Sequence, residues 1–150
     1  MTGTNADRLT FIRPAEQKDA GRIAEMFIFN YRLNFYPIFR NDQYYFDDLQ
    51  VGKMDVPLQN TFVYDDGVVK GFVQLNGQEV RKLFVEPVLQ GQGIGAALLE
   101  YAVHQHGARF LWALEKNTRA VAFYQCHGFH ATGERRPEED TAEYLIRLER

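Results

Sequence analysis

Apolar residues recur along this chain with two different periods, and the order of those periods predicts a mixed fold. From Ile94 the apolar positions fall at 94, 97, 98, 101 and 102, which is the spacing of one helix face. The stretch from Val80 to Val85 is short, rich in β-forming residues and followed by Pro87, so it predicts a strand. A glycine-rich loop, Gln90 to Gly95, leads from that strand into the helix.

The same periods, and the turn residues between them, predict the other elements. Further strands are expected at Leu9 to Arg13, Thr61 to Tyr64, Val68 to Leu75, Arg109 to Leu114, Phe129 to Gly133 and Tyr144 to Leu148. Further helices are expected to begin at Pro14-Ala15-Glu16, at Phe46 (ending at Met54) and at Thr118 (ending at Cys126). The charged segment Glu134 to Asp140 is expected to be a solvated loop.

The loop from Gln90 to Gly95 has a composition that suits an anion. Its three glycines, at 91, 93 and 95, allow a tight turn and leave backbone N–H groups bare of side chains. A helix N-terminus carries about half a positive charge and up to about four unpaired N–H donors, so such an entry favours phosphate. A plain glycine turn into a helix is the alternative interpretation.

Two nucleotide motifs can be compared with this loop. A P-loop requires a Lys after its last glycine, and none follows here. A Rossmann fingerprint fits on paper through Gly91, Gly93, Ala96 and the acidic Glu115. Its first glycine belongs directly at the strand end, whereas residues 86 to 90 intervene here, and the chain supplies only one βαβ unit.

A third interpretation is a resemblance to a known family. The segment Gln90-x-x-Gly93-x-Gly95, after Leu83-Phe84-Val85-Glu86-Pro87, resembles the acyl-CoA pyrophosphate signature of the GNAT superfamily of N-acetyltransferases. The segment from Asn117 to Phe129 resembles the later N-x-x-A-x-x-F-Y-x-x-x-G-F element of that family, at the expected distance. The likeness covers nearly the whole chain and is weakest from Phe27 to Asn60.

The resemblance implies an α+β fold. We expect a central mixed, mostly antiparallel sheet of about six or seven strands, flanked by about four helices and splayed between the fourth and fifth strands. With 150 residues and 45% hydrophobic content, residues 1–150 are expected to form a single N-acetyltransferase domain.

Composition narrows the functional classes. No run of 18 apolar residues and no export leader is recognised, so we expect no membrane insertion and a cytoplasmic location. The formal charge of −3, with scattered basic residues, argues against nucleic-acid binding. Cys126 is the only cysteine, which excludes an intramolecular disulfide and a cysteine-based zinc cluster, and no metal is expected.

The resemblance also implies which residues hold acetyl-CoA. The pantetheine arm pairs with the strand backbone around Leu83, Phe84 and Val85. Backbone N–H groups of the loop hold the pyrophosphate, from Gln90, Gly91, Gln92, Gly93, Ile94 and Gly95. Asn117 contacts the cofactor near the splayed strands, and Tyr124 lies near the thioester sulfur.

Acetyl transfer to an amine in a ternary complex requires two proton movements. An alkylamine with a pKa near ~10.4 is neutral only about once in a few thousand molecules at pH 7, so a base is needed. Glu79, eleven residues before Gln90, resembles in position the glutamate that some histone-type members use as base; an exposed residue after a turn is the alternative. Tyr124 is expected to donate a hydrogen bond to the departing thiolate; a packed helix tyrosine is the alternative.

The acceptor and the partners are less defined by the sequence. The acceptor is expected to be a primary amine of a small molecule, peptide or protein. Aromatic residues are dense from Phe29 to Tyr45, where they form either core or the acceptor wall. Edge strands near the C-terminus could pair two chains as a homodimer. The rival function is a non-catalytic acyl-CoA-binding module.

Overall fold

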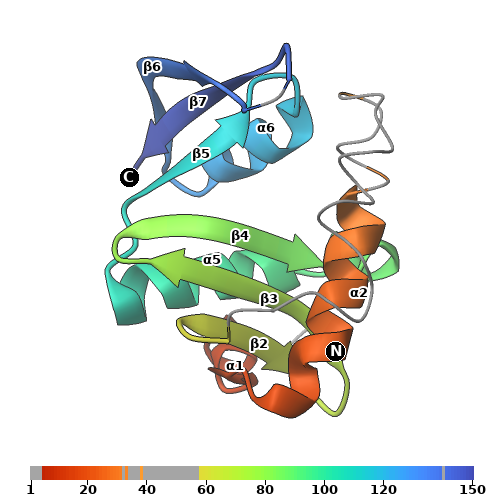
Figure 1. Cartoon of the computed structure of the whole chain (residues 1–150). Helices are drawn as coiled ribbons and strands as arrows, with labels where there is room; N and C mark the ends of the chain where they lie inside the picture. Colours follow the sequence, from red (N-terminus) through yellow and green to blue (C-terminus); the bar gives the residue numbers. More distant parts are fainter. Residues whose placement is uncertain (1–4, 32, 34–37, 39–57, 140) are drawn as a thin grey trace.

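A seven-stranded sheet forms the centre of the computed structural model, which describes residues 5–31, 33, 38, 58–139 and 141–150 (Figure 1). In chain order the strands are β1 (Ile12–Pro14), β2 (Thr61–Asp65), β3 (Val69–Asn76), β4 (Glu79–Val85), β5 (Phe110–Leu114), β6 (His130–Pro137) and β7 (Tyr144–Glu149). Across the sheet they follow the order β1-β2-β3-β4-β5-β7-β6. Every neighbouring pair is antiparallel except β4 and β5, so the mixed, mostly antiparallel sheet is confirmed.

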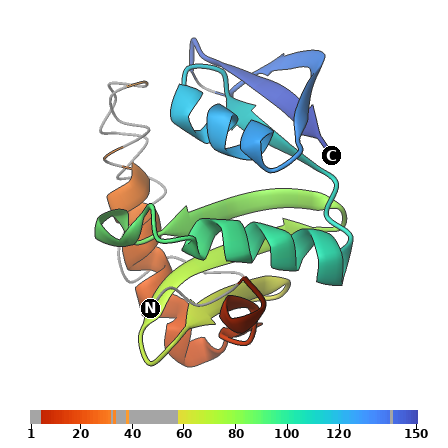
Figure 2. The same cartoon turned by 180° about the vertical axis from the view of Figure 1, so that it is seen from behind.

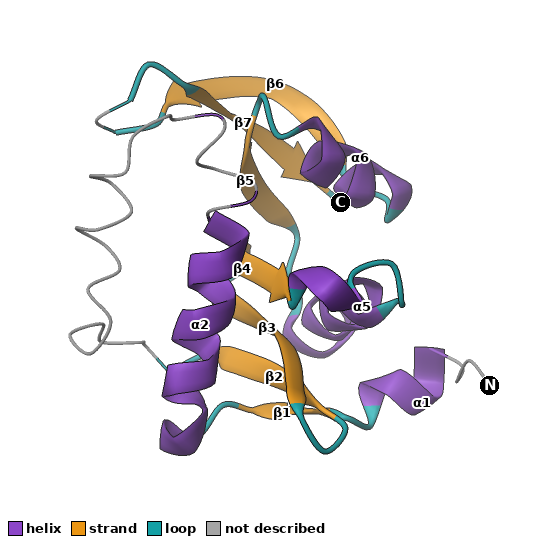
Figure 3. Cartoon of the chain, turned by 90° about the vertical axis from the view of Figure 1, so that its right-hand side faces the viewer, coloured by secondary structure: helices purple, strands orange, loops and turns teal. Residues whose placement is uncertain are grey.

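Helices cover both faces of this sheet, as predicted. In chain order they are α1 (Asn5–Leu9), α2 (Ala20–Asn30), α5 (Ile94–His106) and α6 (Thr118–Cys126), with 3-10 turns η1 (Gln17–Asp19) and η3 (Pro87–Leu89). Helix α2 lies on one face of the sheet, and α5 and α6 lie on the other (Figure 3). Seen from that other face, α5 lies in front of β2 to β4 and α6 in front of β5 and β7 (Figure 2). None of the described helices has the length and apolar character needed to cross a lipid bilayer.

Alternation along the strands divides the core between the two faces. On β2 and β3, Val63 and Phe72 pack with Ile23 and Met26 of α2. Their neighbours in sequence face the other way, where Val73 packs with the buried side of α5. Burying one such side chain fully stabilises the fold by about 1.5–3 kcal/mol. These contacts fix β3 and β4 between two helices.

Strands β4 and β5 are paired over only a short part of their length. Their parallel register contains two residue pairs, Glu79 with Phe110 and Val80 with Leu111. Beyond Val80 the strands part, and the C-terminal end of β4 runs away from β5 (Figure 1). The predicted splay between the fourth and fifth strands is therefore confirmed.

The N-terminal prediction is partly wrong. Leu9 lies in α1 and packs on the core from that helix, and the strand begins only at Ile12, which pairs with Tyr64 of β2. The helix predicted from Pro14 begins later, at Ala20, after the turn η1. The side chain of Asp19 accepts the Glu16 N–H, which stabilises this turn before the helix.

The C-terminal loop prediction is also partly wrong. Strand β6 begins at His130 and continues to Pro137, so residues 134 to 137 of the predicted loop belong to a strand. All eight residues of β6 are exposed, because it is the edge strand of the sheet. Charged side chains are typical of exposed edge strands, and here they led to the prediction of a loop. The predicted helix from Phe46 to Met54, and the aromatic segment apart from Phe29 and Tyr31, lie outside the described residues.

An arginine on β1 joins the start of α2 to the end of β2. Arg13 donates to the Asp19 carboxylate at 2.8 and 3.0 Å and to Asp65 at 3.0 Å. The Arg13 hydrogen bond lowers the pKa of the nearly buried Asp19 below its usual value. A lowered carboxyl pKa means that this stabilisation is fully present above the ordinary pKa and is lost progressively as the pH falls from there through the lower pKa of the folded state.

Replacing Asp19 should therefore have a pH-dependent effect. We expect Asp19→Asn to reduce the free energy of unfolding by about 1.5–3 kcal/mol at pH 7, and the deficit to shrink when the pH falls below the ordinary carboxyl pKa of about 3.9. Urea unfolding of both proteins at pH 7 and at a pH below about 3.9 measures this difference in the free energy of unfolding. The control is Glu134→Gln, an exposed site on β6, and equal deficits at both pH values would contradict the assignment.

Candidate functional site

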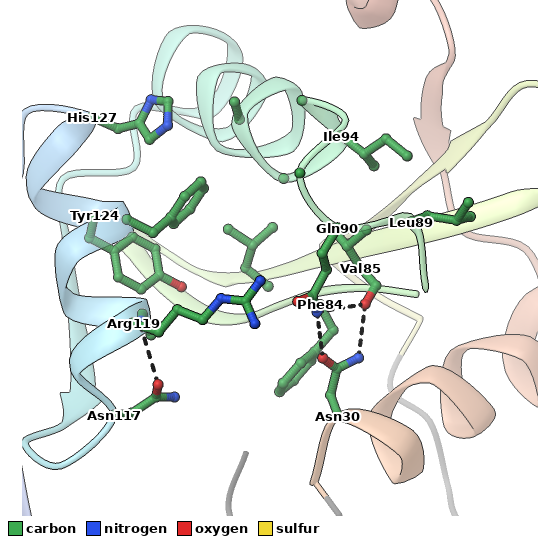
Figure 4. A pocket seen from close by; sticks show the side chains of 17 residues that line it. Asn30, Phe84, Val85, Leu89, Gln90, Ile94, Asn117, Arg119, Tyr124 and His127 are labelled. Atoms are coloured by element: carbon green, nitrogen blue, oxygen red, sulfur yellow. Dashed lines mark hydrogen bonds between the residues drawn. The ribbon is translucent and has the colours of Figure 1, made fainter. Parts of the chain in front are cut away.

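A pocket of about 440 Å³ opens where β4 parts from β5 (Figure 4). Its walls are the end of β4, the loop 89–93, the first turn of α5 and one side of α6. The lining residues are Asn30, Leu83, Phe84, Val85, Leu89, Gln90, Gly91, Gly93, Ile94, Gly95, Ala96, Asn117, Arg119, Ala120, Phe123, Tyr124 and His127. This lining contains no aspartate or glutamate, so the pocket favours an anionic ligand over a cationic one.

The edge of β4 that faces the pocket offers main-chain hydrogen-bonding groups. Across β3 and β4, the N–H of Glu86 donates to the carbonyl of Lys70. Main-chain groups alternate in direction along an antiparallel strand, so those of Phe84 point to β3 and those of Leu83 and Val85 point to the other edge. Beyond Val80 that other edge has no partner strand. An extended ligand with amide groups could pair there as a strand does.

The glycine-rich loop presents the start of α5 to the pocket. Gly93 is the N-cap of α5 with φ of 85°, a left-handed conformation that glycine adopts without strain. Gly95 and Ala96, in the first turn, line the pocket, and N–H groups of a first turn have no partner within the helix. On its other side Gly93 lies against the guanidinium of Arg8, whose Cζ would be 2.9 Å from a Cβ at this position.

Buried amides hold the end of β4 and the loop together. The Asn30 side chain, on an almost fully buried residue, donates through Nδ2 to the Val85 carbonyl at 3.0 Å and to the Met26 carbonyl at 2.9 Å. Gln90 Nε2 donates to Asn30 Oδ1 at 3.1 Å and to the same Val85 carbonyl at 3.3 Å (Figure 4). Helix α2, strand β4 and the loop therefore meet at one hydrogen-bonded point.

Helix α6 supplies the opposite wall. Asn117 caps it by accepting the Ala120 N–H at 3.3 Å, which confirms the predicted start of the helix. Tyr124 lies one turn further on, packed against Phe123 and Phe129 at ring distances of 5.3 and 5.9 Å. Tyr124 is half-buried and its hydroxyl points into the pocket (Figure 4). Shielding of this hydroxyl from solvent raises its pKa above the usual value near 10. Its phenol therefore stays protonated at physiological pH and can donate a hydrogen bond.

The structure brings most of the predicted binding residues together around this pocket. Those that line it are Leu83, Phe84, Val85, Gln90, Gly91, Gly93, Ile94, Gly95, Asn117 and Tyr124. Gln92 belongs to the same loop but is not among the lining residues. Glu79 is at the first position of β4, beside Phe110 at the joined end of the two strands, and does not line the pocket.

Sequence reasoning missed two polar residues of the lining, Asn30 and Arg119. Asn30 falls on the apolar face of α2, seven residues after Ile23, and a polar residue on such a face was a readable signal. Arg119 is a cation in the first turn of a helix, where a positive charge is unfavourable unless an anion is near. His127 caps the C-terminus of α6 and also lines the pocket.

Comparison with known sequences identifies relatives of this chain. Residues 57–131 match the model of the acetyltransferase (GNAT) domain family. The chain is 38% identical over 73 residues to the peptidyl-lysine N-acetyltransferase YiaC of Escherichia coli, covering 48% of this chain and 50% of that protein. It is 39% identical over 71 residues to the peptidyl-lysine N-acetyltransferase YjaB of Salmonella typhimurium, covering 47% and 49%. The matched part thus spans about half the length of these curated relatives.

Comparison with solved structures shows the same fold. The solution structure of apo-form YjaB from Escherichia coli superposes with a TM-score of 0.76 at 21% identity, covering 92% of this chain and 95% of that one. The PaiA N-acetyltransferase of Thermoplasma acidophilum, solved in complex with coenzyme A, superposes with a TM-score of 0.68 at 16% identity, covering 93% and 98%. At these identities the likeness establishes the fold alone. It excludes the Rossmann alternative, whose sheet is mostly parallel.

The loop geometry predicts different effects for two glycine substitutions. Gly91 and Gly93 have nearly the same positive φ, 86° and 85°, but only Gly93 is the N-cap of α5. We expect Gly93→Ala to weaken acetyl-CoA binding by about tenfold or more, because backbone strain of roughly 1–3 kcal/mol at the N-cap shifts the first-turn N–H groups that face the pocket. Gly91→Ala, outside the helix, should weaken binding less.

A thermal-shift titration with acetyl-CoA, NAD and ATP measures this difference. Ligand at ~100 times its dissociation constant adds about 2.7 kcal/mol of stability, so only the ligand that binds should raise the melting temperature. We expect acetyl-CoA alone to stabilise the unsubstituted chain. Equal losses in the two variants would contradict the special role assigned to the N-cap of α5.

Proposed function

The chain belongs to the GNAT acetyltransferase family, and from this we propose that it transfers the acetyl group of acetyl-CoA directly to a primary amine. The observation that carries the proposal is the pocket itself. It joins a strand edge without a partner strand, a glycine-rich helix entry and the hydroxyl of a half-buried tyrosine in one carboxylate-free space. The strand edge suits an amide-containing arm, the helix entry suits a diphosphate, and the tyrosine hydroxyl suits a thioester sulfur.

The amine that we propose is the side chain of a lysine in a peptide or protein. Two curated relatives, 38% and 39% identical over their matched parts, are named peptidyl-lysine N-acetyltransferases. A small-molecule amine is the second candidate for the acceptor. A panel of lysine peptides, polyamines, amino acids and aminoglycosides, with detection of the released thiol, distinguishes the two.

The residues of the pocket fit coenzyme A. The main-chain groups of Leu83 and the N–H of Val85 would pair with the pantetheine amides, because the Val85 carbonyl already accepts from Asn30 and Gln90. The N–H groups at the start of α5 would bind the diphosphate. Asn117 would contact the arm from the opposite wall, although its carbonyl oxygen already caps α6. When bound, acetyl-CoA supplies the activated acetyl group. A strand N–H that donates to the thioester carbonyl oxygen can contribute ~2.7–4 kcal/mol of transition-state stabilisation.

Tyr124 is proposed to assist the departing thiolate by hydrogen bonding. A thiol is normally a stronger acid, pKa about 8.5, than a phenol at about 10, so full proton transfer from a phenol is uphill by roughly 2 kcal/mol. Burial raises the pKa of Tyr124 further and makes complete transfer still less favourable. A neutral phenol that donates without losing its proton keeps its function across the whole physiological pH range.

Glu79 is proposed to take the proton of the amine through water. It precedes Leu83 by four strand residues, a separation of about 13 Å along β4, which is too far for direct contact with a group bound beside Leu83. A carboxylate at the joined end of the two strands, outside the carboxylate-free pocket, can accept a proton without repelling the phosphates. The single-domain organisation, the cytoplasmic location and the homodimer stay predictions.

Replacing Tyr124 with phenylalanine tests catalysis against simple binding. We expect Tyr124→Phe to lower kcat by about 10- to 100-fold, the range of a hydrogen bond to a developing charge, with the dissociation constant of acetyl-CoA nearly unchanged. Because the raised pKa keeps the phenol protonated, the unsubstituted chain should show no falling limb of kcat up to about pH 10. Unchanged kcat in Tyr124→Phe would contradict the role, and no turnover in either protein would favour a binding module.

Replacing Glu79 with glutamine tests the base. We expect kcat/KM for the amine to fall several-fold at pH 7 and to approach the unsubstituted value near pH 10, where about a third of the amine is already neutral. Affinity for acetyl-CoA should stay the same, because Glu79 does not line the pocket. A loss that is constant from pH 7 to pH 10 would assign Glu79 a structural role. Glu134→Gln on the edge strand is the charge-matched control.

A further inference from the structure

Arg119 is a cation that the pocket holds without an acidic partner. It is the second residue of α6, and its exposed side chain extends from that helix into the space between Tyr124 and Gln90 (Figure 4). In the described part of the chain, no carboxylate lies within ion-pair distance of its guanidinium, and none lines the pocket. Most other arginines of the described sheet and helices pair with a carboxylate or cover an aromatic ring, such as Arg13 with Asp19 and Arg136 over Trp112.

The position of Arg119 is electrostatically unfavourable in the absence of a ligand. The first turn of α6 carries the positive end of the helix dipole, and that turn contains no acidic residue. Across the pocket, the start of α5 adds a second positive helix end with unpaired N–H groups. An anion between these two helix ends would be attracted by both of them and by the guanidinium of Arg119.

We propose that Arg119 binds a phosphate group of coenzyme A, from the wall opposite the glycine-rich loop. This assignment rests on the proposed function and adds a side-chain ligand to a phosphate site otherwise formed by main-chain N–H groups. Guanidinium is suited to the task because its planar fork donates two parallel hydrogen bonds to phosphate oxygens. The phosphate is either in the diphosphate or at the 3′ position of the ribose, and both carry the chemistry that Arg119 recognises.

Isothermal titration of the full chain with coenzyme A tests the assignment. We expect Arg119→Gln to weaken binding about tenfold, and Arg119→Lys to weaken it less, because lysine keeps the charge but not the fork. The matched control is Arg109→Gln, which removes the same charge from an exposed arginine outside the pocket and should change the affinity less than about twofold. Raising the ionic strength from about 0.05 to about 0.5 M should weaken the binding of coenzyme A to the unsubstituted chain more than its binding to Arg119→Gln.

Two further ligands identify the phosphate. If Arg119→Gln loses affinity equally for coenzyme A and dephospho-coenzyme A, the contact is to the diphosphate; if it loses affinity only for coenzyme A, the contact is to the 3′-phosphate. S-acetylpantetheine has no phosphate and should bind both proteins equally. Normal binding of coenzyme A by Arg119→Gln, or an equal loss with S-acetylpantetheine, would overturn the assignment alone. An unsubstituted chain that bound no coenzyme A would overturn the proposed function with it.

Discussion

The site depends on the point where two neighbouring strands stop pairing. After Val80, β4 continues without β5, so the main-chain groups of Leu83 and Val85 that face this edge have no strand partner. An unpaired edge inside a sheet is unfavourable unless water or a ligand satisfies its hydrogen bonds. Because β5 does not continue beside β4, the fold leaves main-chain groups of β4 open to a ligand. The neighbouring side chains line the space around that edge.

The surrounding elements keep that edge in place. Helices α2 and α5 hold β3 and β4 from both faces, so β4 cannot move toward β5 without disturbing two cores. Asn30 and Gln90 bind the last carbonyl of β4 and join it to the loop and to α2. A buried amide network whose groups are satisfied makes the local geometry rigid, which preorganises the pocket for a ligand.

Charge divides the molecule into two functional regions. The chain as a whole is acidic, with a formal charge of −3, yet the pocket lining has no carboxylate and receives two positive helix ends. A polyanionic donor is drawn to this space, whereas a protonated amine is not. The acidic residue proposed to serve the amine stands outside the pocket, at the joined end of β4 and β5. Under the proposed function, this separation of charge would allow an anionic donor and a cationic amine to be bound at once.

Local sequence determined much of this protein, including the β4-loop-α5 segment with its glycine-rich turn, the capped helix α6 and the position of Tyr124. Each follows from period, turn residues or capping within about 20 neighbouring residues, where physical rules are local. The edge strand β6 and the start of α2 were misjudged, because the fully exposed β6 lacks the apolar alternation of a strand and the turn η1 delays the start of the helix. Only the tertiary structure brought Asn30 to Val85, 55 residues away, and turned Arg119 toward the loop, since such meetings depend on how helices pack across a sheet.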